Sequence, residues 1–471
     1  MSEKYILAID GGTQSTKVLI FDFQGNVVAQ GRQKLRPMEA PQTGWAEHPD
    51  DDLWASLLLA CREAFSNFSG DPKDIIGVGL CTIRTCRVWL RGDGSLAYPV
   101  INWMDPRAYG PFVVPEGAKD VKYATTTTGY MTHRLTGQFK DTAANCLYWQ
   151  WPTDARTWMW SEDRAVFDYF QLKREQMMEL HMPGDILGTV TKEAAAATGI
   201  PLGIPVVATA NDRAVEALGT GFMQGDSGLI ALGTYSTAML KGTQLQENSK
   251  SYWPNFACVP HQYLFEIMQG IHRGMWTVSW MGNLLAAGDL QQLNAEAAAV
   301  PAGSNGLMTV PEWLVVNSAN TFKKGIILGF DVRHGRGHMF RSLMEGTTLK
   351  LYNGFRAMCE ETGIFPSQLV ASGGGSKGDT FMQIIADVFG LPVQRNEVED
   401  AAGTGAAICA AVATGVYPDF DTAAKAMVRV KDSFLPNMDN HALYMRMNDE
   451  VFRHITQATD SLLEKSYPLF N

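Results

Sequence analysis

The chain opens on short apolar runs that are separated by glycines and polar residues. In residues 4–31, KYILAIDGGTQSTKVLIFDFQGNVVAQG, one apolar run meets a carboxylate, two glycines and several hydroxyl groups before a second apolar run begins. This pattern predicts a β-hairpin, followed by a second turn at Gln24-Gly25-Asn26. Such a turn presents unshielded backbone N–H groups at the end of a sheet.

Strand-like and helix-like stretches then alternate, which favours an α/β architecture. A helix is predicted over 51–68, behind an acidic run that is expected to cap it, and a strand over 75–81. A hairpin that turns at Gly92-Asp93-Gly94 comes next. Residues 106–122 are rich in proline and glycine and predict a loop.

The second half of the chain repeats the plan of the first. Residues 204–221 predict a buried strand, an Asn-Asp turn and a helix of small residues, and residues 227–242 a hairpin with a Gly-Thr turn. Residues 368–395 predict a strand, three glycines, a serine and an amphipathic helix. We therefore expect two domains, over residues 1–222 and 223–471.

Composition narrows the classes of partner. The chain has 471 residues, of which 46% are hydrophobic and 19% are charged, so it can bury large cores. The net charge of −10 argues against nucleic acid or an anionic membrane surface as the main partner. The seven cysteines are scattered and lack metal-site spacing, and the apolar runs are too short to span a bilayer. We expect a soluble cytoplasmic protein without a signal peptide.

Three glycine-hydroxyl turns carry the candidate chemistry, at residues 11–13, 233–234 and 373–376. Their backbone N–H groups suit phosphate, and Asp10 at the end of the first strand suits a Mg²⁺ ion that accompanies phosphates through water. One such turn is also typical of an ordinary hairpin, whereas three favour a nucleotide site. The chain has no Gly-x-x-x-x-Gly-Lys-Ser/Thr loop, which excludes a P-loop protein.

Several separate motifs resemble the FGGY family of carbohydrate kinases, and the resemblance runs from Tyr5 to about Val430. It is closest to enterobacterial members whose substrate is not assigned. The motifs are DGGTQSTK, WMDPRA, LTGQFKDTAAN, NDRAVEALGTG, ALGTYS, GIILGF with HMFRSLMEG, and SGGGSKGDTFMQIIADVFGLPV with AAGTGAAICAA.

The resemblance implies two ribonuclease-H-like domains of the actin-like ATPase superfamily, with an interdomain cleft. It implies ATP-dependent phosphorylation of a hydroxyl of a sugar, sugar acid or polyol, a ketopentose such as xylulose or ribulose being the favoured class. ATP and Mg²⁺ are the implied cofactors, a small sugar or polyol is the implied partner, and relatives of this kind often form homodimers.

The resemblance also implies roles for individual residues. Asp212 would be the general base, and Asp10 would hold Mg²⁺ through water. The remaining positions divide between ATP and the acceptor. Those implied for ATP are Gly11, Gly12, Thr13, Gln14, Lys17, Gly233, Thr234, Gly373, Gly374, Gly375 and Ser376, and those implied for the acceptor are Arg84, Trp103, Asp105 and Asp212.

Two departures from the family leave alternatives open. Many relatives carry a glutamate where this chain has Thr85, and the segment between Asp105 and Asp141 is shorter than usual. A catalytically weak actin-like protein that binds nucleotide or sugar is therefore an alternative, as is an actin-like ATPase of another kind. Asp212 could also simply cap the helix that follows it, and Trp103 could be a core residue.

Overall fold

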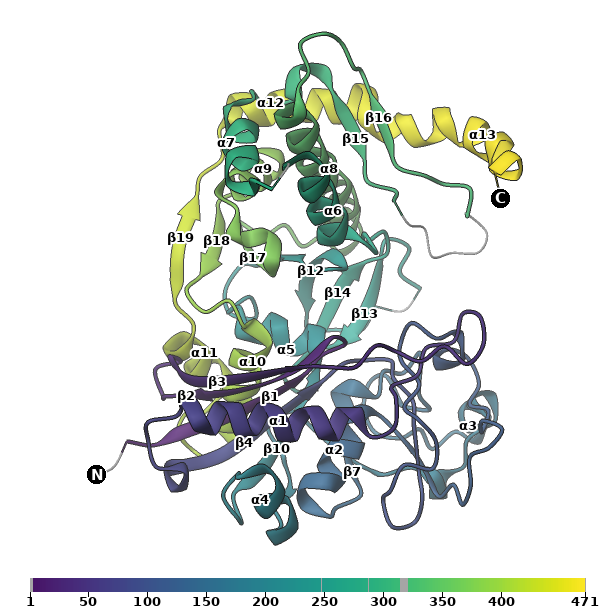
Figure 1. Cartoon of the computed structure of the whole chain (residues 1–471), viewed down its shortest axis with the longest axis vertical. Helices are drawn as coiled ribbons and strands as arrows, with labels where there is room; N and C mark the ends of the chain where they lie inside the picture. The colour runs from purple at the N-terminus through teal and green to yellow at the C-terminus, as the bar shows by residue number, and fades with distance from the viewer. Residues whose placement is uncertain (1–2, 247, 287, 314–320, 471) are drawn as a thin grey trace.

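A computed structural model describes residues 3–246, 248–286, 288–313 and 321–470 of the chain, which fold around two β-sheets (Figure 1). The first sheet has the strand order β3-β2-β1-β4-β10-β9, in which β1, β4 and β10 run parallel. Its strands are β1 (Tyr5–Gly11), β2 (Ser15–Phe21), β3 (Val27–Lys34), β4 (Ile75–Thr82), β9 (Ile186–Thr189) and β10 (Pro205–Asn211).

Helices and short ribbons cover this sheet. On one face of this sheet, α1 packs against β2 and β3. Helix α10, which comes from late in the chain, packs against β1, β4 and β10 through its small side chains. The remaining elements of this half are α1 (Asp52–Asn67), α2 (Thr127–Thr136), α3 (Arg164–Phe170), α4 (Lys192–Thr198), α5 (Asp212–Gly219), β5 (Val88–Leu90), β6 (Tyr123–Thr125), β7 (Lys140–Thr142) and β8 (Glu179–His181).

The second sheet has the strand order β13-β14-β12-β11-β17-β18-β19. Its strands are β11 (Ser227–Leu232), β12 (Ser236–Gly242), β13 (Tyr252–Phe256), β14 (Tyr263–Ile267), β17 (Gln368–Ser372), β18 (Val393–Asn396) and β19 (Val430–Phe434). The other elements of this half are α6 (Gly274–Ala286), α7 (Leu290–Ala299), α8 (Arg336–Thr362), α9 (Asp379–Phe389), α10 (Ala401–Ala413), α11 (Phe420–Met427), α12 (Met438–Met447), α13 (Arg453–Phe470), β15 (Met308–Val310) and β16 (Ile326–Leu328).

The predicted α/β architecture with two sheet-containing domains is confirmed. The opening hairpin is β1–β2, and the Asp22 carboxylate organises the second turn by accepting hydrogen bonds from the amides of Gln24 and Asn26, both at 2.9 Å. The helix predicted over 51–68 is α1, but the acidic run before it has a different use from the predicted cap. The Asp51 carboxylate accepts hydrogen bonds from Tyr130 and Arg134 of α2.

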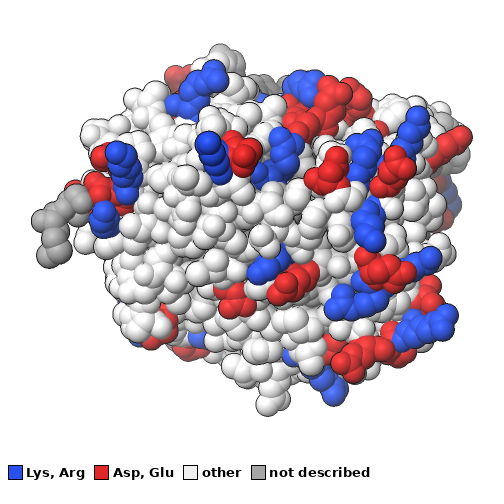
Figure 2. Space-filling view, turned by 90° about the horizontal axis from the view of Figure 1, so that it is seen from below, with Lys and Arg blue, Asp and Glu red and all other residues white. Residues whose placement is uncertain are grey.

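The predicted division between residues 222 and 223 falls between the last strand of the first sheet and the first strand of the second. It stays a prediction, because α10 belongs to the second half in sequence and lies against the first sheet in space (Figure 1). Within the described ranges, every helix is too short or too polar to cross a membrane. Basic and acidic side chains intermingle on the face shown in Figure 2.

Glycines allow α10 to approach its neighbours to backbone distance. A Cβ atom on Gly405 of α10 would lie 2.0 Å from the carbonyl oxygen of Val215 in α5. Conversely, a Cβ on Gly219 of α5 would lie 1.8 Å from the carbonyl oxygen of Ala401. A Cβ on Gly79 of β4 would lie 2.0 Å from the carbonyl oxygen of Ala406. These contacts fix α5 and α10 between the two sheets.

We predict that Gly405→Ala lowers the free energy of unfolding by about 2 kcal/mol or more, because the added methyl group forces the two helices apart. Thermal unfolding of the whole chain measures this. Gly92→Ala is the matched control, since its Cβ would have no neighbour within 4 Å. Equal midpoints for the two variants would contradict the proposed close packing.

Candidate active site

Three parallel strands place the central candidate residues at one edge of the first sheet. β1, β4 and β10 are neighbours, so their carboxyl ends lie together. Asp10 is the penultimate residue of β1, Arg84 follows β4 by two residues, and Asp212 follows β10 directly. Residues that are far apart in sequence therefore meet because of strand order.

The first glycine turn connects β1 to β2 and contacts the candidate acceptor segment. The amide of Gly12 donates to the carbonyl oxygen of Ser15 at 3.0 Å, which closes the turn. The indole Nε1 of Trp103 donates to Oγ1 of Thr13 at 2.9 Å. Gln14 is exposed at the tip. The structure thus joins a residue predicted for ATP to one predicted for the acceptor.

Asp10 and Lys17 form a buried charge cluster beneath this turn. Lys17 Nζ lies 3.2 Å from Oδ2 of Asp10 and 2.8 Å from Oδ2 of Asp400, the residue before α10. Burial raises the pKa of the Asp10 carboxyl to about 6, Lys17 opposes this shift, and the charges of Asp400 and Asp212 add to it. Burial lowers the pKa of Lys17, but the two carboxylates outweigh it and raise the value to about 12.

The donor set around Asp10 fits a magnesium ion that is shared with phosphates. Groups of three or more histidine, cysteine or acidic side chains able to hold a metal are absent from the described part of the chain. Mg²⁺ is commonly held by one or two carboxylates together with water and phosphate oxygens. Asp10 offers hard oxygen atoms of the kind that Mg²⁺ prefers, and the charge of Asp212 acts to raise the pKa of the Asp10 carboxyl, a repulsion of the kind that a divalent cation relieves.

In the structure, Asp212 is not the residue that caps α5. Asn211 caps α5, because its Oδ1 accepts a hydrogen bond from the amide of Ala214 at 3.2 Å. Oδ1 of Asp212 accepts from the adjacent amide of Arg213 at 3.0 Å, and the side chain is half-buried. The Asp212 carboxylate thus lies at the amino end of a helix with an oxygen available for a ligand.

The second turn connects β11 to β12 and lies next to the residue after Asp212. Nη2 of Arg213 donates to the carbonyl oxygen of Tyr235 at 3.3 Å, and Ser236 Oγ donates to the carbonyl oxygen of Gly233 at 3.1 Å. Thr234 is exposed at the tip. Arg213 thereby connects the candidate base to the turn that is predicted to hold phosphates.

The third turn packs against the second. Gly373 has φ of 82°, and a Cβ there would lie 2.6 Å from the carbonyl oxygen of Leu232, so this close approach requires glycine. Gly375 is buried, where a Cβ would lie 2.7 Å from Sδ of Met275, whereas Gly374 is exposed. A short 3₁₀ turn over Gly374–Lys377 precedes α9, so the glycines lie ahead of the helix and do not open it directly.

An open cavity of about 190 Å³ lies beside this third turn. Gly373 and Ser376 line it together with Lys377, Arg395 and Asn396. Arg395 Nη1 donates to the carbonyl oxygen of Ser376 at 3.0 Å and so fixes the turn. The hollow under the first turn, in contrast, is too small for a ligand.

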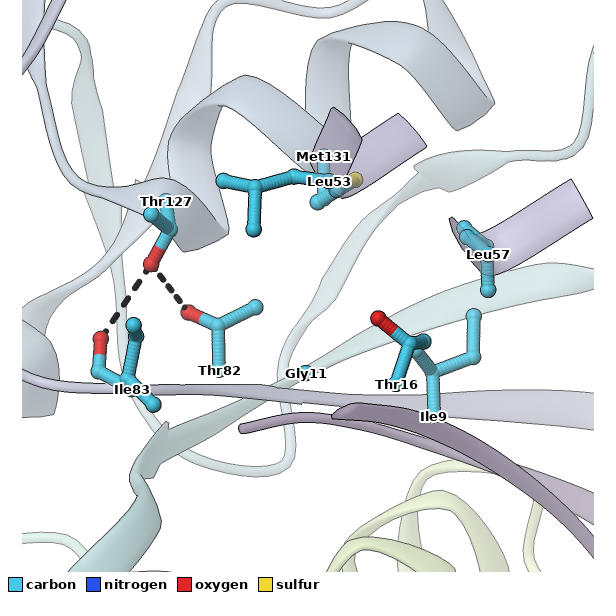
Figure 3. A pocket seen from close by; sticks show the side chains of 9 residues that line it. All are labelled: Ile9, Gly11, Thr16, Leu53, Leu57, Thr82, Ile83, Thr127 and Met131. Atoms are coloured by element: carbon cyan, nitrogen blue, oxygen red, sulfur yellow. Dashed lines mark hydrogen bonds between the residues drawn. The ribbon is translucent and has the colours of Figure 1, made fainter. Parts of the chain in front are cut away.

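That hollow is shown in Figure 3. Its volume is about 10 Å³, which is near the minimum for one water molecule. Thr127 donates a hydrogen bond to Oγ1 of Thr82 at 2.8 Å on its wall (Figure 3). These contacts support the strand ends from behind.

The four residues predicted for the acceptor have different surroundings. Trp103 and Arg84 are half-buried, and Arg84 lies within electrostatic reach of Asp212. Asp105 is fully buried, and its carboxylate accepts from the amide of Ala46 at 2.7 Å and from Arg107 at 2.6 Å. This geometry favours a supporting role for Asp105 over the direct acceptor contact expected from the sequence.

Two residues with clear contacts in the site went unnoticed in the sequence, Arg213 and Glu266. Glu266 lies in β14, and its carboxylate accepts from Nη1 of Arg84 at 3.0 Å. A single acidic residue in the apolar run YLFEI is a detectable signal, because a buried charge needs a partner. Arg213 gives a weaker signal, as a cation next to a candidate base.

Comparisons with known proteins give a family for both halves of the chain. The N-terminal domain of the FGGY family of carbohydrate kinases matches residues 5–112 and 113–219, and its C-terminal domain matches residues 228–414. Uncharacterized sugar kinase YgcE of Escherichia coli (strain K12) is 45% identical, over 100% of this chain and 97% of that protein.

More distant matches also carry the names of sugar kinases. The xylulose kinase of Bacillus subtilis (strain 168) is 25% identical, over 98% of both chains. The crystal structure of a gluconate kinase from Lactobacillus acidophilus has a TM-score of 0.87 at 20% identity, covers 100% of both chains, and shows the fold.

We predict that Asp105→Ala lowers the free energy of unfolding by about 2 kcal/mol, because it leaves the half-buried amide of Ala46 and part of Arg107 without an acceptor. Thermal unfolding checks this, with Asp168→Ala as the control. Asp168 forms an exposed pair with Arg164 at 3.7 Å, which contributes little. If Asp105→Ala left the stability unchanged, the result would support the predicted contact of Asp105 with the acceptor instead.

Proposed function

The chain belongs to the FGGY family of carbohydrate kinases, and we propose that it transfers the terminal phosphoryl group of ATP to a hydroxyl of a sugar, sugar acid or polyol. The observation that carries the proposal is that residues of two glycine turns lie near one carboxylate. Arg213, next to Asp212, contacts the turn of the second sheet, while Asp10, at the start of the first turn, lies within electrostatic reach of Asp212.

In this proposal the nucleotide lies along the three turns. The first turn contains Gly11, Gly12, Thr13 and Gln14, and the second contains Gly233 and Thr234. Backbone N–H groups of both turns, other than that of Gly12, which closes the first turn, would bind the phosphates. Gly373, Gly374 and Ser376 border the adenosine beside the cavity of about 190 Å³. Gly375 supports them through packing.

Charge neutralisation supports phosphoryl transfer at this place. Mg²⁺, when bound, would neutralise phosphate charge, and Asp10 would hold it through water. Lys17 places a cation beneath the first turn, and Arg213 places one beside the second. Transfer of a phosphoryl group depends mainly on position and charge stabilisation, which these residues supply.

Asp212 is the proposed general base. Because Asn211 caps α5, the Asp212 carboxylate is left to accept the proton of the acceptor hydroxyl and to orient it. Arg84 and Trp103 are the proposed acceptor contacts, since an indole offers apolar area to the C–H face of a sugar. A ketopentose such as xylulose or ribulose is the first class to test, because a xylulose kinase is among the full-length relatives.

Thr85 and the short segment 106–140 favour an alternative, a catalytically weak protein that binds nucleotide or sugar. Thr85 has φ of 67°, and its hydroxyl donates to Oε1 of Gln150 at 3.2 Å rather than offering a carboxylate. Sugar-dependent ADP release separates the alternative from the kinase.

The cytoplasmic location and the homodimer stay predictions. The seven cysteines are buried free thiols.

We predict that Asp212→Asn lowers the kcat for sugar-dependent ADP release by about 100-fold or more, because it removes the proton acceptor. The assay offers Mg-ATP with ketoses, polyols and sugar acids, and nucleotide binding is measured in parallel. Asp168→Asn is the control for a surface charge change. Full activity of Asp212→Asn, or no sugar dependence of the unaltered protein, would contradict the proposal.

Removal of divalent cations is predicted to abolish turnover without changing the thermal unfolding midpoint of the protein free of nucleotide. The reason is that the proposed ion is held mainly by phosphates and water, and therefore adds nothing to the fold on its own. Titration with a chelator and readdition of Mg²⁺ check both quantities. A fall in the midpoint would indicate a structural metal instead.

A further inference from the structure

An ion pair joins residues of the two halves of the chain next to the proposed base. Nη1 of Arg84, at the edge of the first sheet, lies 3.0 Å from Oε2 of Glu266, and Nη2 lies 3.4 Å from Oε1. Glu266 belongs to β14 of the second sheet. The pairing is therefore bidentate and joins the two domains at the place where the acceptor is proposed to bind.

Glu266 is held in this position from its own domain as well. Nδ2 of Asn255 on the neighbouring strand donates to Oε2 of Glu266 at 3.3 Å, and Nε1 of Trp149 donates to Oδ1 of Asn255 at the same distance. Only 4% of the Glu266 side chain is exposed. Burial acts to raise the pKa of Glu266, but Arg84 and Arg213 outweigh it and lower the value, so the carboxylate is ionised.

The first domain offers no comparable carboxylate beside Arg84 at the next position along the chain. Thr85 is buried, and its hydroxyl points to Gln150. The acceptor side of the site, in the described residues, therefore combines two cations, Arg84 and Arg213, with three carboxylates, Asp212, Glu216 and Glu266, and Glu216 pairs with Arg213 at 3.0 Å. Both guanidinium charges are therefore balanced by a carboxylate before any acceptor binds.

This balance bears on which acceptors fit. A neutral polyhydroxyl compound can donate O–H groups to Glu266 and accept from Arg84 without adding charge. A sugar acid would bring a further carboxylate into a poorly solvated site whose guanidinium groups are already paired, and uncompensated buried charge is costly. The same pair would thus attract one acceptor class and reject the other.

We propose that Glu266 is a specificity-determining residue contributed by the second domain, which binds hydroxyls of a neutral sugar or polyol and, by pairing with Arg84, excludes sugar acids. This inference rests on the proposed kinase function and narrows its acceptor class. With Glu266 in this role, the acceptor site contains residues of both domains and is complete only when the two domains are in contact.

The test compares the unaltered full-length protein with Glu266→Gln on D-xylulose, D-ribulose, glycerol and D-gluconate. We expect the unaltered protein to prefer a neutral acceptor. In Glu266→Gln, kcat/KM for that acceptor should fall by about 10- to 100-fold, the effect of losing a charged hydrogen-bond acceptor. The ratio of kcat/KM for gluconate to that for the neutral acceptor should rise at least about tenfold, because Arg84 is freed.

Glu296→Gln is the matched control, because Glu296 forms a similar bidentate pair with Arg336, at 2.8 and 2.6 Å, in the same domain. It should leave the acceptor ratio unchanged. Nucleotide binding and thermal unfolding show whether each variant is folded. Should Glu266→Gln be unstable, the double variant Arg84→Gln with Glu266→Gln removes the unpaired cation, and it should lose the neutral preference without gaining gluconate turnover.

Three outcomes would overturn the inference. A preference of the unaltered protein for gluconate would contradict it while leaving the kinase function intact. Unchanged acceptor ratios in folded Glu266→Gln would show that the pair is only structural. Turnover with none of the acceptors, despite bound ATP, would count against the proposed function itself, and the inference would fall with it.

Discussion

The close approach of α10 to α5 and β4 is the constraint on which the rest of the structure depends. Backbone atoms meet there at distances that leave no room for a Cβ on Gly79, Gly219 or Gly405. Because α5 begins at Asp212 and α10 begins after Asp400, this contact also fixes where two carboxylates stand relative to the first sheet. The packing of small residues thereby sets the positions of these two carboxylates.

Charge then joins the two domains on both sides of Asp212. Lys17 of the first sheet pairs with Asp400 ahead of α10, and Arg84 pairs with Glu266 of β14. In both pairs the cation comes from the first domain and the partner carboxylate from the second. Each pair is partly or largely buried, where an unpaired charge would be unfavourable.

Local signals made much of the site predictable. Glycines with neighbouring hydroxyls marked all three turns, because only a few residue types allow a tight turn and a close backbone approach. The same kind of reasoning was wrong for the cap of α1, where Asp51 binds Tyr130 and Arg134 of another helix. It also gave Asp105 a ligand role, which stays a prediction; in the structure the Asp105 carboxylate accepts hydrogen bonds from the amide of Ala46 and from Arg107.

The sequence by itself determined the α/β class, the glycine turns, the candidate base Asp212 and the family, because each rests on periodicity or on a motif of a few adjacent residues. Tertiary structure alone decided which carboxylate pairs with which cation. Glu266 and Arg84, for example, are 182 positions apart in the sequence. Pairing across such a distance depends on strand order and on the packing of α10, and neither is written in a local stretch of sequence.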